Sequence, residues 1–168
     1  MQAVEAYIGL GSNLSNPLAQ VSTALEELHA IKETQLLRSS SLYTSKPMGP
    51  SDQPDYVNAV AELSTTLEPQ ALLEALQAIE QAHRRQRKDQ RWGPRTLDLD
   101  IILYGDLQMD SKLLQIPHYG VAEREFVLIP LQELQADLII PGKGAVEDLI
   151  AQLPPYELLK LKKNNEQT

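Results

Sequence analysis

The chain has 168 residues, 42% of them hydrophobic and 23% charged, which is enough for one globular domain with an ordinary core. Its net charge of −8 argues against general nucleic-acid binding, and the lack of cysteine excludes disulfides, thiolate metal sites and cysteine nucleophiles. No apolar run approaches a bilayer-crossing length and the N-terminus lacks the basic cluster of a signal peptide, so we expect a cytoplasmic protein.

The first predicted elements are a strand and a helix. A short, mostly apolar segment at residues 5–10 predicts the strand, which Gly9 and Gly11 are expected to end. Asn16-Pro17 is typical of a helix start, because asparagine caps the helix and proline is tolerated at its first position. The apolar face of this helix is predicted at Leu18, Val21, Leu25 and Leu28.

Two further strands are expected at about residues 36–44 and 56–65, with a loop rich in proline and glycine at 45–54 between them. A second helix is predicted to begin at Pro69 and to fade into a basic stretch. Its apolar face is predicted at Leu72, Leu76 and Ile79.

The last predicted elements are a fourth strand at 97–103, short helices near 129–134 and 146–153, and a polar, frayed tail at 160–168. The order strand, helix, strand, strand, helix, strand matches the α+β ferredoxin-like βαββαβ plan, a mainly antiparallel sheet covered by helices, here with C-terminal additions. We therefore expect a single domain over residues 1–159. This plan hosts many functions, so the chemistry has to be argued from particular residues.

Asp98 and Asp100 stand two positions apart in the fourth predicted strand and therefore share one face, with Leu99, Ile101 and Leu103 expected on the other. Aspartate is a poor strand former and like charges repel, so the pair suits a place where hard cations bridge it. Mg²⁺ takes one or two carboxylates together with substrate phosphates and water, and two such ions fit this pair. A polar strand face open to solvent is the alternative interpretation, and spacing alone does not decide between them.

A basic segment directly precedes these aspartates. Between residues 83 and 95 six lysine and arginine residues accompany Asp89 alone, although the whole chain is acidic. Cations beside metal-binding carboxylates are what phosphoryl transfer needs, and Gly93-Pro94 would let the segment bend as a lid. A solvated helix end followed by an exposed loop is the alternative.

Two other patterns are ambiguous. The run from Gly9 to Asn13 matches neither the dinucleotide fingerprint nor the P-loop, and we interpret it as a tight turn into the helix. Tyr56 and Asn58 share a strand face and suit a flat heterocycle, since one stacks and the other donates and accepts hydrogen bonds. An ordinary half-buried strand carries such pairs as well.

Five segments occur together in this order. They are Gly11-Ser12-Asn13-Leu14, Gly49-Pro50, the run from Asp52 to Ala59, the run from Arg91 to Ile101, and Pro117-His118. Together they resemble the 6-hydroxymethyl-7,8-dihydropterin pyrophosphokinase family of folate biosynthesis. The resemblance covers nearly the whole chain, from about Ala6 to Leu153, and the block from Arg91 to Ile101 is close to diagnostic.

The resemblance implies a monomer that moves the β,γ-diphosphate of ATP to the hydroxyl of 6-hydroxymethyl-7,8-dihydropterin and leaves AMP. It implies two Mg²⁺ ions on Asp98 and Asp100. The implied catalytic residues are Arg85, Arg95, Asp98 and Asp100. The implied ATP contacts are Gln77, Glu80, Arg85, Arg87, Arg91, Arg95, His118, Tyr119 and Arg124. The implied pterin contacts are Ser45, Met48, Tyr56, Asn58, Trp92 and Phe126.

The sequence departs from the family pattern at Leu113 and Gln115, where some relatives carry a basic residue and a threonine, and the adjacent Lys112 is a candidate substitute. Two alternative functions remain open. A small nucleic-acid-binding module would use the basic segment and would bind in a strongly salt-dependent way. A metal-dependent phosphoesterase would use the two aspartates and would release phosphate without an acceptor.

Overall fold

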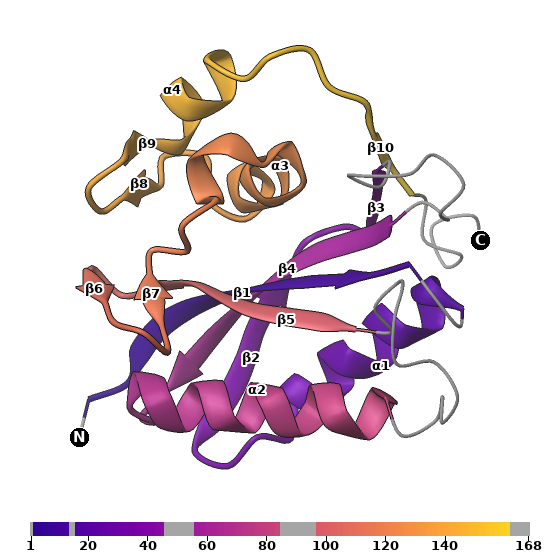
Figure 1. Ribbon diagram of the computed structural model, residues 1–168, viewed down its shortest axis with the longest axis vertical. Coiled ribbons are helices and arrows are strands. Elements are labelled where there is room, and N and C mark those ends of the chain that lie inside the picture. The colour runs from indigo at the N-terminus through magenta and orange to yellow at the C-terminus, as the bar shows by residue number, and fades with distance from the viewer. Residues whose placement is uncertain (1, 14–15, 46–55, 85–96, 162–168) are drawn as a thin grey trace.

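The computed structural model describes residues 2–13, 16–45, 56–84 and 97–161, and a six-stranded antiparallel sheet is the centre of this part of the chain (Figure 1). The elements that build the sheet and cover one face are β1 (Val4–Ser12), α1 (Pro17–His29), β2 (Thr34–Ser39), β3 (Tyr43–Ser45), β4 (Tyr56–Thr65), α2 (Pro69–Arg84), β5 (Asp98–Tyr104) and β10 (Leu158–Lys160). The remaining elements are β6 (Met109–Asp110), β7 (Gln115–Ile116), the 3-10 turn η1 (Val121–Glu123), α3 (Glu125–Leu134), β8 (Ile139–Ile140), β9 (Gly144–Ala145) and α4 (Val146–Ala151).

The strand order is β10-β3-β4-β1-β5, and β2 also pairs with β4. Every pairing in this sheet is antiparallel, and β1 lies between β4 and β5. The predicted ferredoxin-like plan is therefore confirmed, because the first strand is central and each helix returns the chain to the same sheet.

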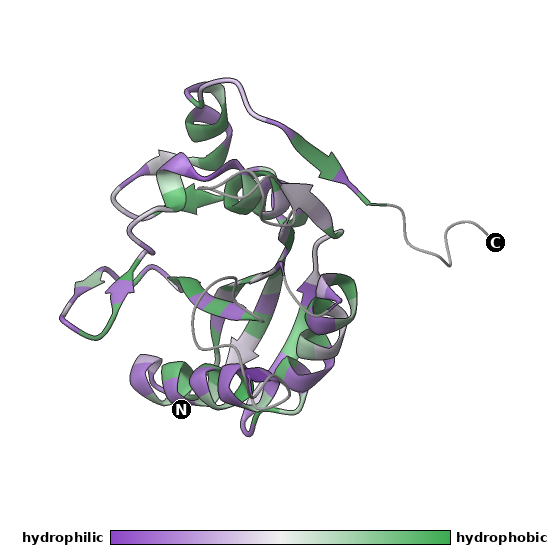
Figure 2. Ribbon diagram, turned by 45° about the vertical axis from the view of Figure 1, so that its right-hand side comes forward, coloured by the Kyte–Doolittle hydropathy of each residue, from purple (hydrophilic) through white to green (hydrophobic). Residues whose placement is uncertain are grey.

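The sheet has a helical layer on each face. In Figure 1, α1 and α2 lie below the sheet and α3 and α4 lie above it. One buried cluster joins Ile8 and Leu10 of β1 to α1 and α2, and a second joins Tyr7 and Ile102 to α3 and α4. Figure 2 shows α2 with hydrophilic and hydrophobic residues alternating along it, as expected for a helix with one face on a sheet. Within the described ranges, no helix combines the length and apolarity that a bilayer crossing needs.

The predicted helix starts are confirmed. Asn16 caps α1 with its backbone in the left-handed region (φ 63°), and its Oδ1 accepts a hydrogen bond from the Ala19 N–H at 3.4 Å. Pro17 follows as the first helical residue, where no N–H is needed. Pro69 likewise begins α2, which ends at Arg84 next to the basic segment.

The prediction that glycine ends the first strand is wrong. Strand β1 continues through Gly9 and Gly11 to Ser12, paired with β4 on one side and β5 on the other. Pairing on both sides fixes the extended backbone there, which outweighs the low strand preference of glycine. The interpretation of this run as a tight turn is therefore also wrong.

Two other expectations about the strands need correction. The second expected strand is two strands, β2 and β3, because the ladder is interrupted at Ser40. The Ser40 N–H donates to the Val60 carbonyl at 2.8 Å, but the Val60 N–H donates to Ser40 Oγ at 2.9 Å. Leu103 joins the cluster under α3, because the register of β1 and β5 shifts between Tyr7 and Ile8.

The ends of the predicted C-terminal elements also differ. Helix α3 begins at Glu125, one turn before the expected 129, and carries Pro130 inside it. Lys160, expected in the frayed tail, belongs to β10, where it is paired with β3. Residues 162–168 of the predicted tail lie outside the described residues, and the domain boundary at 159 stays a prediction.

Candidate active site

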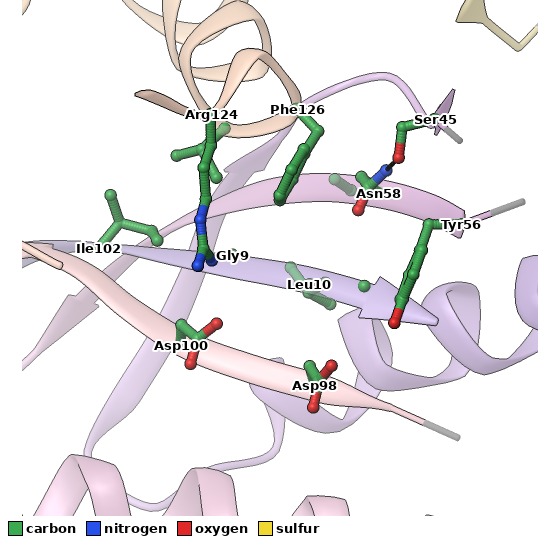
Figure 3. A pocket seen from close by; sticks show the side chains of 13 residues that line it. Gly9, Leu10, Ser45, Tyr56, Asn58, Asp98, Asp100, Ile102, Arg124 and Phe126 are labelled. Carbon is green, nitrogen blue, oxygen red and sulfur yellow. Dashed lines mark hydrogen bonds between the residues drawn. The ribbon is translucent and has the colours of Figure 1, made fainter. Parts of the chain in front are cut away.

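The two glycines of β1 position the site. In the register of the sheet, Gly11 lies between Asn58 of β4 and Asp98 of β5, and Gly9 lies opposite Asp100. Because glycine has no side chain, this part of the sheet face is open below α3. A cavity of about 180 Å³ occupies it. The side chains around the cavity that carry chemistry are Ser45, Tyr56, Asn58, Asp98, Asp100, Arg124 and Phe126 (Figure 3).

Asp98 and Asp100 form the acidic wall. Both side chains project from β5 toward the cavity, as their spacing predicted, and both are half-buried (Figure 3). Between them the Leu99 N–H donates a hydrogen bond to the Glu80 carboxylate of α2 at 2.8 Å. Burial raises the pKa of Glu80, and the charges of Asp98 and Asp100 raise it further. Three carboxylates therefore make this edge of the sheet strongly negative.

The donor set of this wall suits Mg²⁺. Within the described residues, no group of three or more histidine, cysteine, aspartate or glutamate side chains is arranged to hold a metal ion. The protein donors available are therefore the two aspartates, which are hard oxygen ligands at a cavity open to substrate. Mg²⁺ commonly keeps water and substrate phosphates and takes only one or two carboxylates, so the residues fit this ion.

The opposite wall is aromatic and carries one amide. Phe126 lies at the start of α3, Tyr56 is the first residue of β4, and Asn58 lies between them (Figure 3). Asn58 is buried, and its Nδ2 donates a hydrogen bond to Ser45 Oγ at 2.7 Å. That bond fixes the orientation of the amide. The wall therefore offers two ring faces and a fixed amide edge, which suits a flat heterocycle with polar edges.

Arg124 lies at the N-terminal end of α3, between the two walls. Its guanidinium carbon lies 5.3 Å from the Tyr119 ring centre and 5.7 Å from that of Phe126, and Nη2 donates to the Tyr119 hydroxyl at 3.3 Å. A Cβ on Gly120 would lie 2.5 Å from Arg124 Nε, so a larger residue there would displace this side chain. Arg124 brings a positive charge to the cavity that holds both aspartates.

Asp100 also lines a second cavity of about 310 Å³, and His118 lies there beside it. Its Nδ1 accepts a hydrogen bond from the Gly120 N–H at 3.1 Å, and its Nε2 lies 3.9 Å from Asp100 Oδ2. Burial lowers the pKa of His118, and Arg124 lowers it further while Asp100 opposes this. A neutral ring in this arrangement carries its proton on Nε2, facing Asp100.

The structure brings together nine of the predicted site residues. Seven surround the first cavity, and His118 and Tyr119 line the second one together with Asp100, Lys112 and Leu113. Glu80 contacts the β5 backbone, and Gln77 is exposed on α2 outside both cavities. The predicted residues that lie outside the described ranges are Met48, Arg85, Arg87, Arg91, Trp92 and Arg95.

Sequence reasoning missed Gly9, Gly11 and Gly120. Two glycines at alternate positions next to a strand are the signal that was available, because alternate positions share a face and leave it open. Gly120 carries no such signal, because the close approach of the Arg124 side chain to it cannot be read from residue spacing.

The fold and the site define a ferredoxin-like α+β protein whose pocket joins two carboxylates, an arginine and an aromatic slot with a fixed amide. Residues 7–136 match the family model described as 7,8-dihydro-6-hydroxymethylpterin-pyrophosphokinase. A 2-amino-4-hydroxy-6-hydroxymethyldihydropteridine pyrophosphokinase of Haemophilus influenzae is 48% identical over 94% of this chain and 98% of its own length. A protein of the same name from Pseudomonas aeruginosa is 49% identical over 88% and 91%. The chain belongs to the hydroxymethyldihydropterin pyrophosphokinase family.

The fold is also that of a solved relative. The crystal structure of Plasmodium falciparum HPPK-DHPS, wild type with pterin and p-hydroxybenzoate, superimposes with a TM-score of 0.69 over 90% of this chain at 13% identity. This chain spans 43% of that solved chain. The comparisons support neither the nucleic-acid-binding module nor the phosphoesterase.

Proposed function

We propose that the chain transfers the β,γ-diphosphate of ATP to the hydroxymethyl group of 6-hydroxymethyl-7,8-dihydropterin, giving the pterin diphosphate and AMP in folate biosynthesis. Membership in the family gives the reaction class and its two substrates. One structural observation supports it most directly. The acidic wall and the aromatic wall face the same cavity, with Gly11 of β1 between Asp98 and Asn58.

The aromatic slot is the proposed pterin site. The pterin ring would lie between Tyr56 and Phe126, and the Asn58 amide would read its polar edge. Because Nδ2 of Asn58 donates to Ser45, Oδ1 is the atom left to accept from a ring N–H or amino group. The remaining proposed pterin contacts, Met48 and Trp92, lie outside the described residues.

The acidic wall is the proposed site of ATP phosphates and Mg²⁺. Asp98 and Asp100 would hold two Mg²⁺ ions, which when bound neutralise the phosphate oxygens and stabilise charge as it shifts toward AMP. Arg124 lines the same cavity as this wall, and His118 and Tyr119 line the adjoining second cavity, so these three are proposed ATP contacts. Gln77 and Glu80 remain proposed contacts on α2.

The basic segment would complete the phosphate site. Arg85 and Arg95 are proposed catalytic residues, with Arg87 and Arg91 as further ATP contacts, and all four lie outside the described residues. Lys112 lines the second cavity beside Leu113 and Gln115, where it can supply the basic group that some relatives carry nearby. Arg95→Ala is expected to weaken catalysis with the fold kept.

The bond changes of the proposed reaction are simple. The pterin hydroxyl oxygen forms a bond to the β-phosphorus and releases its proton to water. The bond from that phosphorus to the α–β bridging oxygen breaks, and AMP leaves with that oxygen and the electron pair of the broken bond. The protein has little covalent chemistry to do, and its task is to place the hydroxyl in line and to shield the charge. The first cavity fits that task because the acidic wall and the aromatic wall both line it.

The test is AMP formation by the purified protein supplied with ATP, Mg²⁺ and 6-hydroxymethyl-7,8-dihydropterin, with pterin omitted as the control. AMP that depends on pterin, without ADP, is the expected result. ATP hydrolysis at the same rate without pterin would overturn the proposal in favour of a phosphoesterase. A cytoplasmic monomer is proposed as well, and light scattering of the purified protein in solution tests the monomer.

A further inference from the structure

We propose that Glu133 of α3 is a positioning residue that fixes the two sides of the pterin slot relative to each other, an inference that rests on the proposed function. Glu133 lies in the last turn of the helix whose first residues carry Arg124 and Phe126. Its carboxylate binds the segment that leads into Ser45. One side chain thus joins α3, which carries Phe126, to β3, whose Ser45 is bound to the Asn58 amide.

The carboxylate of Glu133 accepts hydrogen bonds from three donors on one short stretch of chain. The Ser41 N–H lies 3.1 Å from Oε1 and 3.0 Å from Oε2, and Ser41 Oγ donates to Oε2 at 2.7 Å. The Tyr43 hydroxyl donates to Oε1 at 2.5 Å. Both Ser41 and Tyr43 are buried, whereas Glu133 itself is exposed to solvent. Hydrogen bonds to an ionised acceptor are among the stronger ones, so this contact fixes the segment in place.

The fixed segment is the start of the pterin site. In β3, Tyr43 lies opposite Asn58 and Ser45 lies opposite Tyr56. Ser45 then accepts the hydrogen bond that orients the Asn58 amide. A shift of β3 relative to α3 therefore changes the distance between the amide edge and Phe126, which is the dimension that a bound ring would sense.

Glu133 is not required to keep β3 in the sheet. The strand pairs with β4 on one side and with β10 on the other, and these backbone hydrogen bonds do not involve Glu133. Losing the carboxylate should therefore loosen the fit between α3 and β3 while the sheet stays formed. This separates a positioning role from a purely structural one.

A second polar network at the same end of α3 provides a matched control. The Tyr7 hydroxyl donates to Gln135 Oε1 at 3.0 Å and to Glu62 Oε2 at 3.3 Å, so a buried tyrosine again ties the end of α3 to the sheet. Tyr7 is in β1, and Glu62 binds Arg38 of β2, away from Ser45. Tyr43→Phe and Tyr7→Phe thus remove the same group from two anchors, of which only one adjoins the pterin slot.

The experiment measures steady-state AMP formation with pterin and ATP varied in turn, for the wild type, Glu133→Gln, Tyr43→Phe and Tyr7→Phe. We expect Glu133→Gln and Tyr43→Phe to raise KM for pterin roughly tenfold and to keep KM for ATP within about twofold of the wild type. Tyr7→Phe should leave KM for pterin unchanged, even if its melting temperature falls as far as that of Tyr43→Phe. Calorimetric titration with 6-hydroxymethylpterin and a non-hydrolysable ATP analogue should show the same order.

The outcomes are distinguishable. A wild-type protein that makes no pterin-dependent AMP would overturn the proposed function itself. An active wild type with an unchanged KM for pterin in both Glu133→Gln and Tyr43→Phe would overturn the role of Glu133. So would an equal rise in KM for pterin in Tyr7→Phe, because the effect would then come from loosening α3 in general. If Glu133→Gln fails to fold, Tyr43→Phe decides alone, since it keeps the bonds to Ser41.

Discussion

Gly11 lies directly opposite Asn58 in the sheet, and a Cβ added to Gly11 would lie 3.2 Å from Asn58 Oδ1. Asn58 is buried and its Nδ2 donates a hydrogen bond to Ser45, so its movement is restricted. The glycine thus leaves room for an amide oxygen that faces the cavity and is otherwise available to a ligand. The contact ties the sequence of β1 to the proposed pterin site.

Gly11→Ala is expected to raise KM for pterin by about an order of magnitude, because the methyl group displaces Asn58 Oδ1 or breaks the hydrogen bond from Asn58 Nδ2 to Ser45. Gly9→Ala is the matched comparison. A Cβ there would meet the end of the flexible Ile102 side chain at 3.1 Å, which can rotate away. Steady-state kinetics of both variants tests this, and an equal effect of the two on KM for pterin would contradict it.

Asp98→Ala and Asp100→Ala are each expected to lower turnover on the order of 100-fold or more, because each removes a proposed Mg²⁺ ligand and its charge stabilisation. Neither variant should lower the unfolding midpoint appreciably, since each also relieves repulsion within the acidic wall that includes Glu80. AMP formation over a range of Mg²⁺ concentrations, together with thermal unfolding, measures both effects. Unchanged turnover in both variants would refute the site.

The helices and the buried strands were predictable because their signals are local. The cap at Asn16, the prolines at 17 and 69 and the regular apolar spacing specify α1 and α2 without help from the rest of the chain. The pairing of Asp98 with Asp100 on one face was predictable for the same reason, since alternation along a strand is a local property.

Features fixed by tertiary contacts were not predictable. Strand β1 extends through Gly9 and Gly11 because two neighbours pair with it, and β10 is three residues that become a strand only at the edge of β3. The first turn of α3 was not predicted because proline inside a helix is rare, and Pro130 therefore indicated a helix that begins close to it. Glu133 has no sequence signal, because its donors are about 90 residues away.

The stability contributed by Glu133 should depend on pH. Burial acts to raise the pKa of Glu133, but hydrogen bonds from Tyr43 and Ser41 outweigh it, so the pKa in the folded protein lies below its ordinary value. A carboxyl group with a lowered pKa stabilises the fold above its unfolded-state pKa of about 4.3, and the contribution is lost as the pH falls through the folded-state pKa. The same bond to Glu133, together with burial, raises the pKa of Tyr43.

The measurement is the free energy of unfolding by urea from pH 3 to pH 8 for the wild type and Glu133→Gln. Between about pH 5 and pH 8 the difference between the two proteins should be constant, and below about pH 4 it should shrink. A difference that grew as the pH fell would contradict the assigned sign.

His83, the last buried residue of α2, should stabilise the contact between the two helices under the sheet. Its Nε2 lies 2.6 Å from Glu27 Oε1 and its Nδ1 contacts Gln20 Oε1, both on α1. His83→Ala would leave Gln20, which is buried, without this ring, and it should lower the free energy of unfolding by about 1–3 kcal/mol. His29→Ala is the control, because that ring accepts one exposed hydrogen bond from the Leu36 N–H and should cost less. Urea unfolding of both variants tests the order, and a larger loss for His29→Ala would show that the buried contact is not the stronger one.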